Sequence, residues 1–240
     1  GVRFGFKIIE DASHAIGGLY KGEPIGNCRY SDITVFSFHP VKIITTGEGG
    51  IAVTKSSELA SRLERYRSHG ITRDQALMTE PMHGSWYYQQ VTLGFNYRMT
   101  DIQAALGVSQ ITRLTDYISR RQSIARRYNE LLADLPLTLP WQLADSQSAF
   151  HLYVIRLNIE TIIPTHRQVF EALRAKSIMV NLHYIPVHTQ PYYQKMGFKQ
   201  GDYPEAEKYY REAISIPMHA NLTDNELNFV AVSLREAMGL

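Results

Sequence analysis

Three residues in the first part of the chain carry groups that could act together on one ligand. Asp11 follows the apolar residues of "KIIEDA", Ser37 lies in "DITVFSF", and Lys42 comes five residues after Ser37 in "FSFHPVKIITTGEGG". Most lysines lie on solvated surfaces, but Lys42 has apolar or uncharged neighbours on both sides. An amine that is shielded from water has a lowered pKa and can attack a carbonyl group.

This combination of a carboxylate, a hydroxyl and a lysine suits pyridoxal phosphate. That cofactor needs an amine for its aldehyde, a carboxylate that keeps its pyridine nitrogen protonated, and hydroxyl or N–H donors for its phosphate. Each residue also has a simpler interpretation, since Asp11 could cap a turn and Ser37 could bond its own backbone. The three together, in this order and spacing, favour the cofactor site.

The segments around these residues are predicted to be strands. We expect a short buried strand in residues 7–12, a second in residues 32–38, which alternate and are rich in β-branched and aromatic types, and a third in residues 49–54. In an α/β sheet, groups at the carboxyl ends of neighbouring strands meet in one crevice. Asp11, Ser37 and Lys42 could therefore face the same ligand.

The middle of the chain is predicted to be helical around one long loop. Residues 56–70 begin with the capping residue Ser56 and end at a glycine, and residues 99–135 follow a cap at Thr100 as one long helix or two consecutive helices. Residues 71–96 between them are polar and aromatic without a clear period. Loops of this length in compact domains are usually functional.

The last part of the chain changes character and predicts an α+β unit. We expect a strand in 150–158, a strand followed by a turn in 179–188, and helices in 165–178, 203–217 and 223–239. The predicted domains are residues 1–110, residues 111–135 as a linking helix, and residues 136–240 as a small α+β domain.

Composition excludes several classes of protein. The net charge is +2, from 25 basic and 23 acidic residues, so no bulk field favours nucleic acid or a membrane. The basic run 119–128 predicts a solvated helix face, or alternatively an anion contact.

The single cysteine, Cys28, predicts a small core residue rather than a nucleophile and fits a reducing compartment. No signal peptide or membrane span is evident, so we expect a cytoplasmic protein.

Four segments carry a specific resemblance: "IIEDASHAIGG", "SFHPVKIITTGEGG", "GSWYYQQVTLGFNYRMTDIQAAL" and "HYIPVHTQPYYQKMGF". Together they resemble the sugar-nucleotide aminotransferases of the DegT/DnrJ/EryC1/StrS family, and most closely the branch that aminates a UDP-linked 4-keto-6-deoxy-N-acetylhexosamine in pseudaminic acid biosynthesis. The resemblance implies an α/β, aspartate-aminotransferase-like fold (PLP fold type I). Its three-layer large domain would be incomplete at the N-terminus, and a small α+β C-terminal domain would follow. The resemblance implies that residues 1–110 are the C-terminal part of this PLP-binding large domain.

The resemblance also implies roles for five residues. Lys42 would form the internal aldimine with pyridoxal 5'-phosphate, and Asp11 would pair with the pyridinium nitrogen. His14 would lie beside the ring and its phenolic oxygen, although a lone histidine is more often structural. Ser37 would bind the phosphate. Asn96 would reach the phosphate of a cofactor held mainly by a neighbouring subunit, which makes the active site a property of a homodimer.

Three further residues are implied to contact the sugar nucleotide: His183, Tyr184 and Trp86. For the two aromatic residues, packing within the protein is an equally good interpretation. A metal site at His183 and His188 is disfavoured, because a spacing of five does not place both on one helix face and no carboxylate lies between them.

The expected activity is transamination of a 4-keto-6-deoxy sugar nucleotide, with glutamate as the amino donor. The family's segment before "IIEDA" supplies strands, a phosphate-binding turn and a ring-stacking aromatic residue, and the chain as given lacks it. An inactive or partner-requiring fragment that acts only by association is therefore the alternative, and a large exposed apolar surface is expected. A dehydratase of the family is disfavoured because those members replace the lysine.

Overall fold

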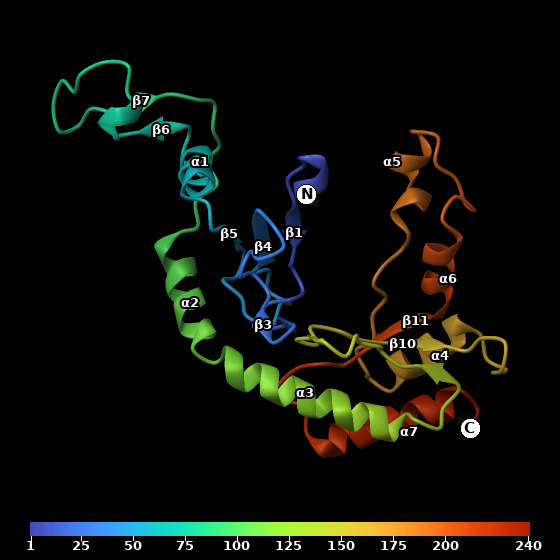
Figure 1. Ribbon diagram of the computed structural model, residues 1–240. Helices are drawn as coiled ribbons and strands as arrows, with labels where there is room; N and C mark the ends of the chain where they lie inside the picture. The colour runs from blue at the N-terminus through green and yellow to red at the C-terminus, as the bar shows by residue number, and fades with distance from the viewer. The chain divides into compact units, whose positions relative to one another are not determined.

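The computed structural model describes residues 1–240, with the exception of the side chain of Val2. The chain divides into two compact units, Gly1–Thr115 and Asp116–Leu240, here called the N-terminal and the C-terminal unit. Each is described by itself (Figure 1). No helix in the described part of the chain is both long enough and apolar enough to cross a membrane.

The N-terminal unit contains short strands, two helices and two short 3-10 turns. In chain order these are η1 (Val2–Phe4), β1 (Ile9–Asp11), β2 (Leu19–Tyr20), β3 (Glu23–Pro24), β4 (Ile33–Ser37), β5 (Gly50–Val53), α1 (Ser57–Arg67), β6 (Ile71–Thr72), η2 (Gln75–Leu77), β7 (Gln89–Gln90) and α2 (Asp101–Ile111). The three strands and the two helices predicted in this unit are confirmed. The β2–β3 hairpin was not predicted.

A three-stranded sheet in the order β1–β4–β5 forms the centre of this unit. Strand β4 runs parallel to β1 and antiparallel to β5. The prediction that the first strand is buried is wrong: Ile9 is 68% exposed, and Asp11 is exposed as well. A parallel strand is buried when it has neighbours on both edges, and among the described residues β1 pairs only with β4.

The predicted loop 71–96 contains a small hairpin. Strands β6 and β7 pair antiparallel, with Ile71 opposite Gln90, and the segment between them extends beyond α1 (Figure 1). The backbone N–H of His69 donates to the carbonyl of Phe95 at 2.8 Å, which fastens the far end of the segment to the end of α1. The two ends of the long loop are therefore held together by backbone hydrogen bonds.

The C-terminal unit is an α+β arrangement around its own core. Its elements are α3 (Leu114–Leu131), β8 (Leu137–Thr138), β9 (Ser146–Gln147), β10 (Tyr153–Leu157), α4 (His166–Ala175), η3 (Val187–Thr189), α5 (Pro191–Gln194), α6 (Pro204–Glu212), β11 (Ala213–Ile216) and α7 (Asp224–Ala237). The unit boundary falls in the first turn of α3. Strands β11, β10 and β8 form an antiparallel sheet.

Burial in the C-terminal unit follows the helical and strand periods of the sequence. Alternate residues of β10 are buried, including Tyr153 and Ile155, and they pack with apolar residues of α3, α4, β11 and α7 in one cluster. Helices α3 and α7 lie side by side (Figure 1), and the side chain of Arg235 on α7 bonds Asp134 just after α3. This unit therefore has a complete core.

Two predictions in this unit are wrong. The strand predicted at the start of residues 179–188 is absent, since Asn181 makes only a single bridge to Ser215. The turn predicted after it is present as η3, which follows Pro186, a residue without an N–H. The end of the predicted helix 203–217 is the strand β11 instead, because all four of its residues are buried and β10 offers them an antiparallel partner.

The prediction of a solvated face for the basic run is wrong for Arg121. Its side chain is 7% exposed, and its guanidinium donates to the carbonyls of Phe150 at 2.8 Å and Met218 at 3.0 Å. Burial lowers the pKa of Arg121 to about 10. Arg126 on the same helix is exposed, as predicted.

Large apolar side chains are exposed over much of the N-terminal unit. On α2, Ile102 is 85% exposed and Val108 is 67% exposed, and Leu93 just before this helix is 82% exposed. Two hollows of about 520 and 530 Å³ flank β5 and are lined largely by apolar residues. The predicted exposed apolar surface is present.

Candidate functional site

Asp11 and Ser37 lie at the carboxyl ends of two adjacent parallel strands. Asp11 is the last residue of β1 and stands opposite Val35 of β4, and Ser37 ends β4 two residues later. The N–H of Ala12 donates to the carbonyl of Val35 at 2.9 Å, so the pairing continues past Asp11. The parallel register places the carboxylate and the hydroxyl at the same edge of the sheet, as the sequence predicts.

Lys42 lies in the loop that joins β4 to β5. The loop closes on itself, because Phe38 donates its N–H to the carbonyl of Gly49 at 2.8 Å and accepts the N–H of Thr46 at 3.0 Å. Within it, the N–H of Lys42 bonds the carbonyl of His39 at 2.9 Å. Ile43 and Ile44 are buried directly after Lys42, so the lysine is held at the edge of packed structure and is itself half-buried.

Charge couples Lys42 to Asp11. Burial lowers the pKa of Lys42, and the nearby Asp11 carboxylate opposes that change. Conversely, the pKa of Asp11 is lowered first by a hydrogen bond from the Ser13 side chain, then by the Ser13 backbone, and also by the charges of His14 and Lys42. Asp11 is therefore ionised at neutral pH, and a larger fraction of Lys42 is the free amine than for a fully solvated lysine.

Ser13 is a site residue that the sequence reasoning missed. Its backbone N–H and its hydroxyl both donate to Oδ1 of Asp11, at 3.0 and 2.5 Å. The signal in the sequence was the spacing of a serine two residues after an aspartate, which is typical of an Asx turn. His14 follows directly and is exposed.

The other two predicted residues of the N-terminal unit lie outside the β1–β4 edge. Asn96 is exposed and forms a backbone bridge with Ser68 at the end of α1, four residues before the cap of α2. Trp86 lies in the β6–β7 segment with 73% of its surface exposed. Their predicted roles remain predictions.

The remaining predicted residues belong to the C-terminal unit. His183 is half-buried, and its Nδ1 lies 2.7 Å from the hydroxyl of Ser215, whereas Tyr184 is 64% exposed. His188 is buried, and its Nε2 lies 2.9 Å from Oε1 of Glu207. The two histidines of "HYIPVH" thus have different partners.

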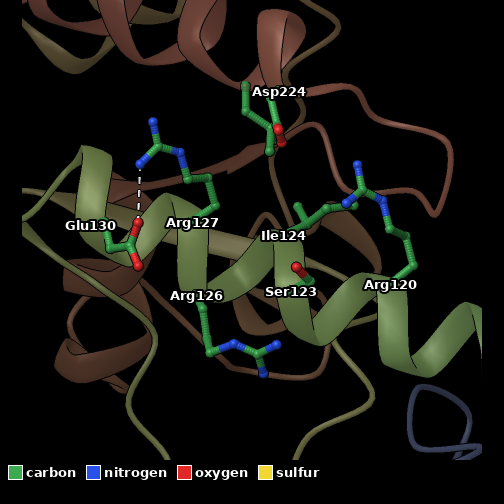
Figure 2. A pocket seen from close by; sticks show the side chains of 8 residues that line it. Arg120, Ser123, Ile124, Arg126, Arg127, Glu130 and Asp224 are labelled. Atoms are coloured by element: carbon green, nitrogen blue, oxygen red, sulfur yellow. Dashed lines mark hydrogen bonds and ion pairs between the residues drawn. The ribbon is translucent and has the colours of Figure 1, made fainter.

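Two further features carry no chemistry of their own. Cys28 is half-buried rather than a core residue, and its thiol bonds the carbonyl of Val53 at 3.3 Å. A pocket of about 270 Å³ lies between α3 and the start of α7 (Figure 2). Arg127 in it pairs with Glu130 at 3.0 Å, and Asp224 faces the same space. None of the predicted site residues lines this pocket.

Solved structures of sugar aminotransferases share this fold. Helicobacter pylori PseC, an aminotransferase involved in the biosynthesis of pseudoaminic acid, is 30% identical, with a TM-score of 0.88 over 99% of this chain and 61% of that chain. Spr1654 from Streptococcus pneumoniae, in its PMP form, is 31% identical, with a TM-score of 0.88 over 98% of this chain and 59% of that chain. The expected α/β, aspartate-aminotransferase-like fold (PLP fold type I) is confirmed.

Sequence comparison agrees with the structural comparison. The UDP-4-amino-4,6-dideoxy-N-acetyl-beta-L-altrosamine transaminase of Campylobacter jejuni is 34% identical over 233 residues, which are 97% of this chain and 58% of that protein. The chain spans 57–60% of the length of the curated relatives that it matches. The model of the DegT/DnrJ/EryC1/StrS aminotransferase family matches residues 2–235. This chain therefore belongs to the DegT/DnrJ/EryC1/StrS aminotransferase family.

Proposed function

We propose that the protein is a pyridoxal-phosphate-dependent aminotransferase that converts the 4-keto group of a 6-deoxy sugar nucleotide into an amine. The observation that carries the proposal is the pair formed by Lys42 and Asp11. A half-buried amine with a lowered pKa stands in electrostatic contact with an ionised carboxylate at the carboxyl edge of a parallel strand pair.

The residues at this edge fit the cofactor in their chemistry. Lys42 supplies the amine that bonds the aldehyde, Asp11 supplies an anion for the protonated ring nitrogen, and Ser37 supplies a hydroxyl for the phosphate. His14, next to this group, would lie beside the ring and its phenolic oxygen. When bound, the cofactor supplies an electron sink that stabilises negative charge on a substrate carbon.

The proposed work of the protein is then to hold charges and to move protons. Asp11, whose pKa is lowered, would supply the negative charge for the ring nitrogen. Nζ of Lys42 would act as the base that takes the proton from the α-carbon of the amino donor, and it would return a proton at C4 of the sugar in the second half of the reaction. Overall, one amino group would pass from glutamate to the sugar, and 2-oxoglutarate would be released. Because the donor and the sugar react one after the other, ping-pong kinetics are expected.

The substrate class is proposed from the relatives. The Campylobacter jejuni transaminase is named for a UDP-linked amino sugar, and PseC is described as acting in pseudoaminic acid biosynthesis. We infer a UDP-linked 4-keto-6-deoxy-N-acetylhexosamine as the substrate here. His183, Tyr184 and Trp86 are proposed to contact it: Tyr184 and Trp86 are 64% and 73% exposed, and His183 is the half-buried residue that directly precedes Tyr184.

The assembly and the location complete the proposal. Asn96 is proposed to reach the phosphate of the cofactor in a second subunit, so the protein would act as a homodimer. Residues 1–110 would be the large-domain part, 111–135 the linking helix and 136–240 the small domain. A cytoplasmic location agrees with the single cysteine and with a nucleotide-linked substrate.

Covalent attachment of pyridoxal phosphate to Lys42 tests this function. The chain is incubated with the cofactor, reduced with borohydride, digested and examined by mass spectrometry. We expect a phosphopyridoxyl adduct on Lys42 that is absent in Lys42→Ala, while Lys55→Ala, which removes an exposed lysine of the same unit, keeps it.

A folded chain that shows no adduct on Lys42 would overturn the proposal for this chain and would favour the alternative of a fragment that acts through association. If the adduct forms, assays with 4-keto sugar nucleotides and glutamate follow. The family match and the presence of Lys42 favour the enzyme over that alternative.

A further inference from the structure

We propose that Ser13 is a positioning residue that holds Oδ1 of Asp11 and thereby presents Oδ2 to the protonated ring nitrogen of the cofactor. The identity of that ligand rests on the proposed function. Ser13 would act on the orientation and the charge of Asp11 and would not contact the substrate.

The geometry shows how Ser13 acts. Its N–H and its hydroxyl converge on the same oxygen, Oδ1, at 3.0 and 2.5 Å. Neither bond uses Oδ2. Asp11 itself is exposed at the end of β1, where a carboxylate would otherwise rotate about its terminal torsion, which has broad minima. Two donors on one oxygen restrict that rotation.

The backbone around Ser13 fixes the two donors in turn. Ala12, between Asp11 and Ser13, is buried and donates its N–H to Val35 of β4 at 2.9 Å. The N–H of Ala15 then bonds the carbonyl of Ala12 at 2.9 Å. The turn that carries Ser13 is therefore attached to the sheet on one side and closed on the other.

Ser13 also acts on the charge of Asp11. The hydroxyl of Ser13 is the largest cause of the lowered pKa of Asp11, ahead of the Ser13 N–H and of the charges of His14 and Lys42, which face the same carboxylate. A carboxylate with a low pKa leaves the proton on a ring nitrogen instead of taking it. Without the hydroxyl, the carboxylate would become more basic and would compete for that proton.

The first test needs no cofactor. The carboxyl carbon of Asp11 is titrated by ¹³C NMR in the cofactor-free chain, with Asp11→Asn to assign the signal. We expect the midpoint to move to higher pH in Ser13→Ala and to stay near the wild-type midpoint in Ser13→Thr, which keeps the hydroxyl. An unchanged midpoint in Ser13→Ala would overturn the inference.

The second test uses the chain loaded with pyridoxal phosphate. We expect Ser13→Ala to keep the adduct on Lys42 but to bind the cofactor several-fold more weakly, to shift the pH dependence of the visible absorbance band, and to lower kcat about tenfold, the effect of losing about 1.4 kcal/mol. Ser13→Thr should restore all three. Wild-type affinity, pH dependence and kcat in Ser13→Ala would contradict the inference.

The two tests separate the inference from the proposed function. If the wild-type chain forms no adduct on Lys42, the proposed function falls, and the part of the inference that concerns the ring nitrogen falls with it. If the adduct forms and Ser13→Ala behaves as the wild type, only the inference falls.

Discussion

Individual side chains in this protein obtain their charge state from different physical sources. Lys42 is shifted towards its neutral form by loss of water, whereas Asp11 is held in its charged form mainly by hydrogen bonds. Both shifts favour the proposed chemistry. Lys42, the proposed nucleophile, is more often neutral, and Asp11, the proposed partner of the ring nitrogen, stays negatively charged. Paired pKa shifts of this kind make Lys42 and Asp11 the candidate functional pair of this unit.

A second coupled pair, His188 and Glu207, has a structural character. Both residues are buried, with 2.9 Å between Nε2 and Oε1, and the N–H of Gly201 also donates to Oε1 of Glu207. The pKa of Glu207 is lowered, first by the bond from His188 and then by the bond from Gly201. The pair fastens the turn η3 to helix α6.

Glu207 should make the stability of the protein depend on acid pH. Because its pKa is lower in the folded state, its contribution is complete above its ordinary pKa of 4.5 and is lost as the pH falls through the folded-state value. We expect Glu207→Gln to flatten the fall in Tm below about pH 4.5, as measured by circular dichroism. Glu205→Gln, an exposed acid on the same helix, is the control. Equal slopes in the two variants would refute the prediction.

At the scale of elements, the base of the long aromatic segment depends on a close approach of two backbones. Gly70 has a φ of +72°, and a Cβ there would lie 1.8 Å from the carbonyl oxygen of Thr92. The N–H of Val91 bonds the carbonyl of Gly70 at 3.0 Å. The segment that carries Trp86 is thus held by a contact that only glycine permits.

Gly70→Ala should destabilise the N-terminal unit more than Gly22→Ala. Gly22 has a similar φ of +75° but open space around it, so alanine there should cost only the roughly 1–2 kcal/mol of the left-handed conformation. The clash at Gly70 should add a further cost of roughly 1–3 kcal/mol. Urea unfolding followed by the fluorescence of Trp86, in a Trp141→Phe background, measures both variants. Equal losses would show that the segment adapts freely.

At the scale of the whole molecule, the two units differ in how their apolar residues are used. The C-terminal unit buries a continuous cluster that includes Tyr128, Leu173 and Leu234. Among the described side chains of the N-terminal unit, the buried apolar ones are Ala12, Phe36, Ile43 and Ile44. Exposed apolar surface on this scale is typical of interfaces, and the proposed homodimer would cover only a part of it.

Helix α2 is the element on which we expect two copies to associate. It carries Ile102 and Val108 on exposed positions and begins five residues after Asn96, the residue proposed to reach a second subunit. Changing both to serine should weaken self-association at least about 100-fold, since each buried aliphatic side chain contributes roughly 1.5–3 kcal/mol. Sedimentation velocity over a range of concentrations measures this.

The control for that experiment is the pair Phe229→Ser and Val232→Ser on α7, where two apolar residues are 51% and 52% exposed. It removes a comparable apolar surface from the other unit. A chain that is monomeric in the wild type, or an equal effect of the two pairs, would contradict the assignment to α2.

Local patterns in the sequence determined most elements of this protein. Caps at Ser56, Thr100 and Thr223 lie where the sequence places them, because a capping side chain and the first helical turn are neighbours in the chain. The motifs around Asp11 and Lys42 also identified the family, since the spacing of reactive groups is written directly in the sequence.

Tertiary structure decided what depends on distant residues. The exposure of Ile9 depends on which strands pair with β1, and the burial of Arg121 depends on carbonyls from Phe150 and Met218. The end of the predicted helix at 213–216 became strand β11 because β10 offers it an antiparallel partner. The periodicity of a sequence reflects the preference of each segment for helix or strand. The burial and the charge of a side chain are set by neighbours that only folding brings together.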